Sequence, residues 1–520
     1  MRKIIYIKYA VLIGLLLQLA NFVTAQENDQ LNSPLSIELL KARSLWFHSN
    51  NGAGMFFDEL SNFGSLDASY KTAKGDFKLT QQGERENFIN ISSEGGVKLG
   101  DAYAWGEFGY DNITTKGSRF NTAMINPFRA VPYYPVDPNM SEWKKQNYYL
   151  RTKIASKPLF ERYIIGIQAE YVTQTGAKQI DPRSEAYYYH INLKPGIAAF
   201  FGDHQVGLNF EYENMIQETR RHTNSDSQVD QNMFVMKGLG NHYTATIGGL
   251  QSLGGFHYNA NKVGGELQYS YNIADFKFLL FGGFAYHVED VVRDISKPRK
   301  EGTIEQNSFY TKLSAVKEGD NLHRFDFSFR SDRQNGIEYV QVLDQTYEVQ
   351  QWVDVFSSIR SNFNQDDLSA NYDFYRGTNH EYLWKAGIFA NYRLNDDIYF
   401  LPSSERNIDN IYLGINGKVN FKVRNAGKLS VGADVTYKNN LGGHYSYGGA
   451  DPESVVITDF LTPDFAYMTQ DFYKIGGNVS YFNGINPKMG VYVKVAADYY
   501  KPIDEDDYRL EAALGLGFTF

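Results

Sequence analysis

The 520-residue chain contains no cysteine. Disulfide bonds, thiol catalysis and a lipid-modified N-terminal cysteine are therefore excluded. The chain is also poor in positive charge, with 51 Lys and Arg against 60 Asp and Glu, which argues against a nucleic-acid partner. It has no phosphate-binding loop, zinc-ligand spacing or dinucleotide fingerprint, so we expect no cofactor.

Long apolar runs are scarce as well. The one clear run, Tyr9–Ala20, follows the basic start Met1-Arg2-Lys3. Shortly after it comes Val23-Thr24-Ala25, a small-residue pattern typical of a cleavage site. This pattern predicts a cleaved secretory signal peptide at residues 1–25, and hence an exported protein. Removing its three basic residues leaves 48 basic and 60 acidic residues, a formal charge of −12. No later run approaches the roughly 20 apolar residues that a membrane-spanning helix needs.

Aromatic residues are abundant, with 39 Tyr and 36 Phe, and 46 Gly are spread evenly along the chain. The mean hydropathy is nevertheless low, at −0.44. This combination is typical of strands whose alternate residues face lipid and water.

Alternation with a period of two residues is the main structural signal. In the last segment, one face carries the apolar side chains Leu510, Ala512, Leu514, Leu516, Phe518 and Phe520. The opposite face carries Arg509, Glu511 and Thr519. Segments 411–424, 429–437 and 489–499 repeat the pattern. Because a β-sandwich also alternates, the lengths of the connections must decide between the two folds.

Short and long connections alternate along the chain. Residues 99–101, 201–203, 317–320, 425–427 and 483–486 form short ones, whereas 113–145, 218–262, 395–409 and 441–468 form longer polar and aromatic ones. Outer-membrane barrels have this asymmetry. We therefore predict an all-β fold, in which residues 61–520 form a transmembrane antiparallel β-barrel of about 18 strands (range about 16–20) with long extracellular loops. Segments 218–262 and 334–365 could each hold a further strand pair.

A leader at residues 26–60 precedes the first predicted strand. Ser33-Pro34 is a plausible helix cap before an apolar stretch. About 35 residues are too few for a separate plug domain of ordinary size, which argues against a TonB-dependent receptor. The leader is expected either to fold into the lumen as a stopper or to cap the base of the barrel.

Several short motifs carry a family resemblance. Residues 49–55 (SNNGAGM), 126–128 (NPF) and 194–196 (KPG) resemble a Bacteroidetes family of outer-membrane β-barrels with no assigned function. The terminal Phe520 resembles the signal read by the barrel-assembly machinery, which is therefore an expected partner. Residues 51–54 (NGAG) are also similar to the Asn-Pro-Ala-Gly pattern of long-chain fatty acid transporters, with Gly52 in place of the proline. The favoured alternative is a glycine-rich turn into the first strand.

Charged residues on the predicted inward faces are candidates for lining the lumen. They are Arg324, Asp326, Arg330, Lys418, Lys422, Asp434, Lys494, Asp498, Arg509 and Glu511. A charge pattern of this kind could select solutes along a permeation path. For each residue the simpler interpretation is a solvated polar wall whose opposite charges pair.

Aromatic residues in the predicted outer loops are candidates for contacts with a sugar or a protein partner. They are Tyr133, Tyr134, Trp143, Tyr445 and Tyr447. The interfacial aromatic girdle found in such barrels is the favoured alternative.

The sequence thus predicts an outer-membrane barrel, embedded in outer-membrane lipids, that acts as a channel or transporter for an unidentified small solute. The first alternative is a non-conducting barrel whose loops bind a partner or serve in assembly. A lipid hydrolase is a further alternative, but no nucleophile-elbow or His-Glu-x-x-His motif is present. We therefore expect no enzymatic activity and assign no catalytic or metal-binding residues.

Overall fold

The computed structural model describes residues 33–220, 222–223, 231–247, 253–346, 350–377, 380–423, 427–486 and 488–520. The predicted signal peptide, residues 1–25, lies outside this range. The helical elements are α2 (Pro34–Arg43), η1 (Trp46–His48), η2 (Gly52–Asp58), η3 (Ile457–Leu461) and α3 (Thr462–Thr469). No helix of the described residues is long and apolar enough to cross a membrane.

The strands account for most of the chain. The barrel strands are β1 (Phe63–Gly75), β2 (Arg85–Leu99), β3 (Ala102–Ser118), β5 (Ser141–Ala155), β6 (Tyr163–Lys178), β7 (Glu185–Phe201), β8 (His204–Thr219), β11 (Phe256–Ile273), β12 (Phe276–Arg293), β13 (Arg299–Lys317), β14 (Asn321–Asp344), β15 (Gln351–Arg376), β16 (Trp384–Tyr399), β17 (Ser404–Lys422), β18 (Gly427–Ser446), β19 (Phe472–Asn486), β20 (Met489–Pro502) and β21 (Arg509–Thr519). A separate three-stranded sheet contains β4 (Pro135–Val136), β9 (Gln231–Gly238) and β10 (Asn241–Ile247).

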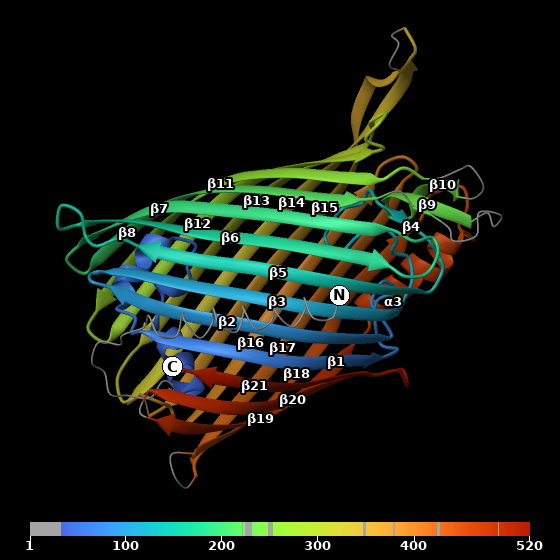
Figure 1. Cartoon of the computed structure of the whole chain (residues 1–520). Coiled ribbons are helices and arrows are strands. Elements are labelled where there is room, and N and C mark those ends of the chain that lie inside the picture. The colour runs from blue at the N-terminus through green and yellow to red at the C-terminus, as the bar shows by residue number, and fades with distance from the viewer. Residues whose placement is uncertain are drawn as a thin grey trace, which may run out of the picture.

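Among the described residues, 18 antiparallel strands form one closed sheet, as predicted (Figure 1). The first and last strands pair with each other, with Ser65 opposite Thr519. Beyond this pair, Gly64 and Phe520 exchange backbone hydrogen bonds of 2.9 and 3.0 Å. The closure leaves no unpaired sheet edge along the wall.

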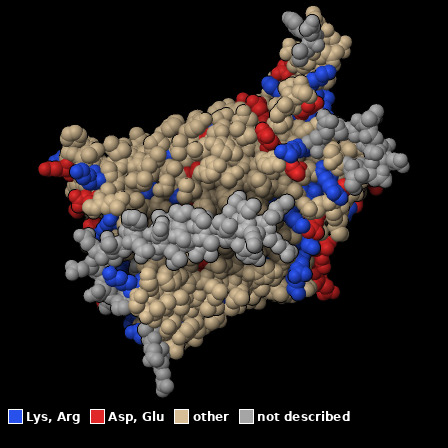
Figure 2. All heavy atoms as spheres, in the orientation of Figure 1, with Lys and Arg blue, Asp and Glu red and all other residues tan. Residues whose placement is uncertain are grey.

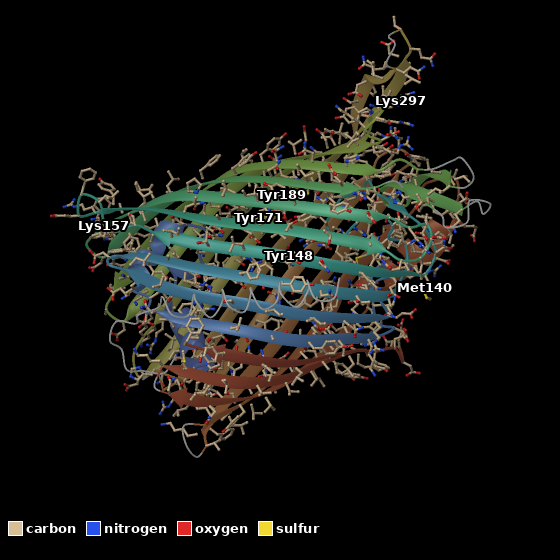
Figure 3. The ribbon with its side chains drawn as sticks, in the orientation of Figure 1. Met140, Tyr148, Lys157, Tyr171, Tyr189 and Lys297 are labelled. Carbon is tan, nitrogen blue, oxygen red and sulfur yellow. The ribbon has the colours of Figure 1, made fainter. Side chains whose placement is uncertain are left out.

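The outer wall is apolar because alternate side chains of each strand point outward. On β17, for example, Leu413 and Ile415 are exposed on the outside, while Lys418 points inward and contacts α2. Figure 2 shows charged residues gathered at the two ends of the barrel, with a largely uncharged wall between them. In Figure 3, Tyr148, Tyr171 and Tyr189 lie on neighbouring strands of this wall.

Short turns lie at one end of the barrel and long connections at the other (Figure 1). Two expectations about the long connections need correction. Segment 395–409 is mostly strand, because β16 and β17 are joined by residues 400–403 alone. Segment 218–262 does contain an additional hairpin, β9–β10. This hairpin forms a separate sheet with β4 and adds no strand to the barrel. Segment 334–365 extends β14 and β15 into a hairpin that projects beyond the rim (Figure 1).

The leader contains the predicted helix and lies inside the barrel. Ser33 caps α2, since its side chain accepts a hydrogen bond from the Ser36 amide. The helix has apolar residues around its whole circumference, as expected of a helix that is surrounded by protein. Leu35 and Leu39 pack in one buried cluster with Leu279 of β12. Ile37 packs in a second cluster with Trp105 of β3.

Candidate functional site

A slot of small residues fixes the second half of the leader to the wall. Gly166 of β6, Gly196 of β7 and Gly207 of β8 lie beneath residues 51–53, so close that a Cβ on Gly166 would stand 2.1 Å from the Ala53 amide nitrogen. The side-chain amide of Asn51 donates to the carbonyl oxygens of Ile197 and Leu208 at 3.1 and 3.3 Å. The predicted glycine-rich turn is therefore wrong, because residues 52–58 form the helical element η2 that this slot holds.

Further polar contacts hold the middle of the leader to the same side of the barrel. The Trp46 indole donates to Gln205 of β8 at 2.8 Å, and Lys153 of β5 donates to the Phe47 and Ser49 carbonyls at 2.6 and 2.8 Å. Asp58 accepts from the backbone amides of residues 45–47 at 3.0, 3.2 and 2.5 Å. Burial raises the pKa of Asp58 to about 7, although these amides favour the carboxylate.

On the opposite side, the leader contacts the wall through charges. Glu38 of α2 accepts hydrogen bonds from Lys385 at 2.6 Å, Lys418 at 2.8 Å and the Tyr382 hydroxyl at 2.7 Å. Burial alone would raise the pKa of Glu38, but Lys418 and Lys385 outweigh it and hold the value at about 2. At the start of the helix, Ser33 donates to Glu381, which also pairs with Lys428.

A cavity of about 700 Å³ lies beside the first turn of α2. Pro34 and Glu38 form its leader side, and strands β15–β20 and β1 supply the remaining wall. Its charged lining consists of Glu38, Asp67, Asp373, Asp434, Lys385, Lys418, Lys474 and Lys494. The signs balance, which suits a hydrated space that holds polar solutes.

The residues predicted to line the lumen fall into three groups. Lys418, Asp434 and Lys494 line the cavity, and Asp498 pairs with Lys474 there at 3.0 Å. The second group lies in ion pairs elsewhere: Arg324 with Asp326 at 2.6 Å, Arg330 with Asp332 at 2.7 Å, Arg509 with Glu86 at 2.7 Å and Glu511 with Lys71 at 2.6 Å. Lys422 is exposed at the end of β17.

Five charged residues of the cavity lining were not among these candidates: Glu38, Asp67, Asp373, Lys385 and Lys474. The period-two pattern could have identified Lys385 and Lys474. Ile388, three positions after Lys385, and Ile475, directly after Lys474, point outward, so both lysines fall on the inward face of their strands. Glu38 has no comparable signal. It stands in a helix with apolar residues on all sides, and its ion-pair partners are 347 and 380 residues away.

The mouth with the long connections is covered by a lid, which we define as residues 119–140, 231–247 and 454–469. Phe120 and Phe460 stack in its centre with ring centroids 4.9 Å apart. The lid is bound to the rim around its circumference: Gln217 of β8, Gln334 of β14 and Lys438 of β18 donate to its carbonyl oxygens.

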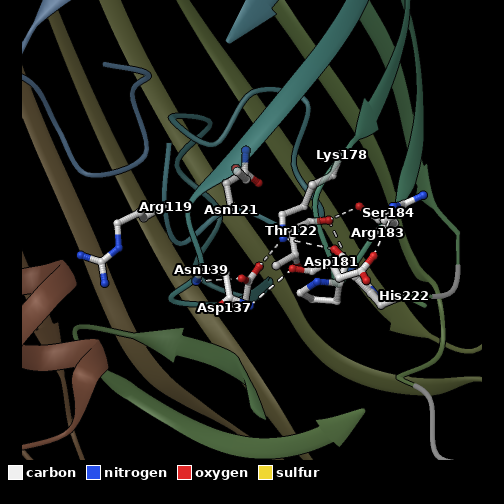
Figure 4. A network of polar contacts seen from close by, with 12 residues as sticks. Arg119, Asn121, Thr122, Asp137, Asn139, Lys178, Asp181, Arg183, Ser184 and His222 are labelled. Carbon is white, nitrogen blue, oxygen red and sulfur yellow. Dashed lines mark hydrogen bonds and ion pairs between the residues drawn. The ribbon is translucent and has the colours of Figure 1, made fainter. Parts of the chain in front are cut away.

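A buried polar network also fastens the lid to the β6–β7 connection (Figure 4). Lys178 lies 2.7 Å from Asp137, and both side chains are almost completely buried. Thr122 contacts His222 at 3.2 Å and donates to the Pro135 carbonyl at 3.0 Å. Removing one partner of a buried ion pair is strongly destabilising, so this edge of the lid is firmly held.

The candidate loop aromatics belong mostly to the lid and its support. Tyr133 and Trp143 are fully buried. Tyr134 packs against the cluster that contains Tyr133 and against the one that contains Phe120 and Phe460. Placing Trp143 in a loop was wrong, because β5 begins at Ser141 and pairs Trp143 with Thr115 and Lys178. Placing Tyr445 in a loop was also wrong, because β18 extends to Ser446 and pairs Tyr445 with Arg406. Tyr445 and Tyr447 are half-buried, and the Tyr445 ring lies 5.8 Å from that of Phe465.

Comparison with known proteins identifies one family. The model of a family of unknown function (DUF6850) matches residues 52–520. No curated protein matches the chain. Similar solved structures include the ferric preacinetobactin receptor BauA of Acinetobacter baumannii, with 7% identity, a TM-score of 0.39, and coverage of 88% of this chain and 80% of that chain. The ferric yersiniabactin uptake receptor FyuA of Yersinia pestis has 8% identity, a TM-score of 0.39 and coverage of 88% and 80%. OpdO of Pseudomonas aeruginosa has 9% identity, a TM-score of 0.32 and coverage of 88% and 96%.

Proposed function

Because the chain belongs to a family of unknown function (DUF6850), its activity must be inferred from the barrel itself, and we propose that it is an outer-membrane transporter that passes small polar solutes through a gated lumen. The closed barrel with its apolar wall and charged ends is the architecture of an outer-membrane β-barrel. The expected signal peptide agrees with export to that membrane.

The cavity beside the leader is the observation that carries the transport proposal. The apolar clusters of the leader involve β1, β3, β5–β7 and β12–β15, and beside its first helical turn the lumen holds a charged, polar space of about 700 Å³. The first turn of α2 lines this space, and Ser33 before it contacts Glu381 in the short β15–β16 connection. A shift of this turn would lengthen the cavity into a passage, provided that the lid also opens.

The packed lid favours a second candidate function. Phe120, Phe460 and the buried Lys178–Asp137 pair close the outer mouth with interactions typical of a protein core. A barrel that works only by presenting this lid to a partner would need no movement. That non-conducting surface protein is the alternative against which the transporter must be tested.

We assign no enzymatic activity. In the lid, Ser454 Oγ lies 3.5 Å from His242 Nε2, but His242 Nδ1 faces the Gly240 carbonyl oxygen at 2.7 Å rather than a carboxylate. A histidine without an acid to orient it is a poor general base for a serine. The pair also belongs to the lid and not to the lipid-facing wall on which a lipid hydrolase would act.

Single-channel recording in planar bilayers tests the proposal. We expect brief openings of the mature protein and more frequent ones in Glu38→Gln, which loses the ion pairs at the first turn of α2. Glu59→Gln is the matched control, because Glu59 is an exposed leader carboxylate. Deletion of residues 34–60 removes the leader obstruction entirely. If all four proteins are folded and silent, transport is refuted and the surface-binding function is favoured.

A further inference from the structure

Lys385 and Lys418 place two positive charges directly opposite each other on neighbouring strands. They are paired in the β16–β17 register, and both point to the lumen. Like charges in this arrangement destabilise a sheet unless an anion lies between them. Here the carboxylate of Glu38 supplies that anion, with Lys385 Nζ and Lys418 Nζ at 2.6 and 2.8 Å.

The three donors around Glu38 form a complete carboxylate site. Besides the two lysines, the Tyr382 hydroxyl donates at 2.7 Å, and Tyr382 itself is almost fully buried. All three donors belong to the wall or its short turn, whereas the acceptor comes from the leader. The site would therefore remain on the barrel if the first turn of α2 moved away.

The cavity gives solutes room to reach this site. With Glu38 in place, its charged lining carries four lysines and four carboxylates; without Glu38, three lining carboxylates face four lysines, and Lys385 and Lys418 lose the carboxylate that they share. Lys494 is one of these four lysines, and it has no ion-pair or hydrogen-bond partner within the described part of the chain. A solute with one carboxylate restores neutrality.

The remaining lining indicates what the rest of the solute would be. Asn416, Thr436, Asn478 and Ser480 supply neutral hydrogen-bonding groups, whereas Phe389 is one of few apolar side chains in the cavity. Hydroxyl groups match such a surface, and a long hydrocarbon chain does not. The acids Asp67 and Asp434 are already engaged by Tyr492 and Lys474.

We propose that Lys385, Lys418 and Tyr382 form a binding site for the carboxylate of a small hydroxylated acid, that Glu38 occupies this site in the closed state, and that the solute displaces Glu38 as it binds. This inference rests on the proposed transport function and names its substrate class. The leader carboxylate acts as an internal competitor, so solute binding and the release of the first turn of α2 are coupled.

Competition gives a direct test by isothermal titration calorimetry of the complete mature protein in detergent, with gluconate as the probe and sorbitol as its neutral six-carbon control. Glu38→Gln is expected to bind gluconate about tenfold more tightly than the wild type, because an internal competitor that is bound most of the time lowers the apparent affinity. Lys385→Gln with Lys418→Gln should weaken binding at least about tenfold. Sorbitol should not bind.

Two matched variants serve as controls: Glu59→Gln and Lys422→Gln change exposed charges away from the cavity and should leave gluconate affinity unchanged. Hydrogen exchange of residues 34–38 should also accelerate when gluconate is added. Unchanged affinity in Glu38→Gln overturns the carboxylate site, even if the lysine variants fail to fold.

The failures of the two proposals are distinguishable. Conductance without tighter gluconate binding in Glu38→Gln refutes the carboxylate site and leaves transport standing. Tighter binding in a barrel that stays silent in every variant supports the site and refutes transport.

Discussion

The glycine slot beneath the leader makes a quantitative prediction for Gly166→Ala. The added methyl would stand 2.1 Å from the Ala53 nitrogen and 2.5 Å from its Cα, whereas ordinary contact needs about 3.5 Å. Both sides of the contact are backbone, so no flexible side chain can move aside. The leader must therefore retreat from β6 by more than about 1 Å.

That retreat breaks the hydrogen bonds of the Asn51 side-chain amide. It donates at 3.1, 3.3 and 3.0 Å to Ile197, Leu208 and Gln268, and each distance would exceed hydrogen-bonding range. The amide has two N–H groups for these three acceptors, so at about 1 kcal/mol net for each bond the docking free energy of residues 45–58 falls by about 2–3 kcal/mol. This corresponds to a shift of up to about a hundredfold in the docking equilibrium.

Hydrogen exchange followed by mass spectrometry measures this shift. Amides of residues 45–58 should lose up to about a hundredfold of protection in Gly166→Ala, with circular dichroism showing an intact barrel. The control is Gly265→Ala on β11, where the nearest atom to the added Cβ is 3.6 Å away. Protection unchanged within about twofold in a folded Gly166→Ala barrel would refute the slot as the leader's anchor.

Two further predictions concern the gates at either end. Because Glu38 has its pKa lowered from 4.5 to about 2, its ion pairs are fully present above pH 4.5 and are lost as the pH falls from 4.5 to 2, a change of at most about 3 kcal/mol. Channel open probability should therefore rise over this range in the wild type and stay flat in Glu38→Gln; parallel profiles would contradict this reasoning. The second prediction concerns Phe460→Ala, which removes a ring that is 2% exposed and stacked on Phe120. The loss of about 3–5 kcal/mol should speed proteolysis within residues 454–469. The control variant Phe128→Ala, at an exposed ring, should not speed it. Equal cleavage of the two variants would exclude Phe460 as the lid's central contact.

The barrel could be predicted from the sequence because each strand carries its own evidence. Lipid and water impose opposite demands on neighbouring residues, so Leu413 and Ile415 point outward while Lys418 points inward. Antiparallel strands joined by short turns then follow in chain order, and the pairing of each strand with the next needs no long-range information. The same local rule applies to Lys385 and Lys474, which also alternate with outward-pointing apolar residues.

The leader and the lid could not be placed by such a rule, because their contacts join distant parts of the chain. Asn51 reaches Gln268 across 217 positions, and the slot that receives Gly52 exists only where three strands bring their glycines together. A glycine in a strand is equally compatible with a bulge, a bend or the close approach of another segment. The SNNGAGM motif therefore indicated a special backbone, but neither its partner nor its helical conformation.

Magnitudes decide which part of the leader can move. Leu35, Ile37 and Leu39 are each at most 8% exposed, and burial of such side chains contributes roughly 1.5–3 kcal/mol apiece, or about 5–9 kcal/mol for the three. The net stabilisation of the charged Glu38, after the cost of its burial, is about 3 kcal/mol, so a solute that replaces its ion pairs cannot extract α2 from its two apolar clusters. The smallest movement open to the leader is a local one, in which Ser33–Glu38 swings away from Lys385 and Lys418 while residues 39–58 stay in place. This swing still exposes Leu35 and Ile37, which costs about 3–6 kcal/mol, so the wild type is expected to open only rarely and briefly. Since Pro34 and Glu38 form the leader side of the cavity, that short swing would widen the cavity on the side of the leader.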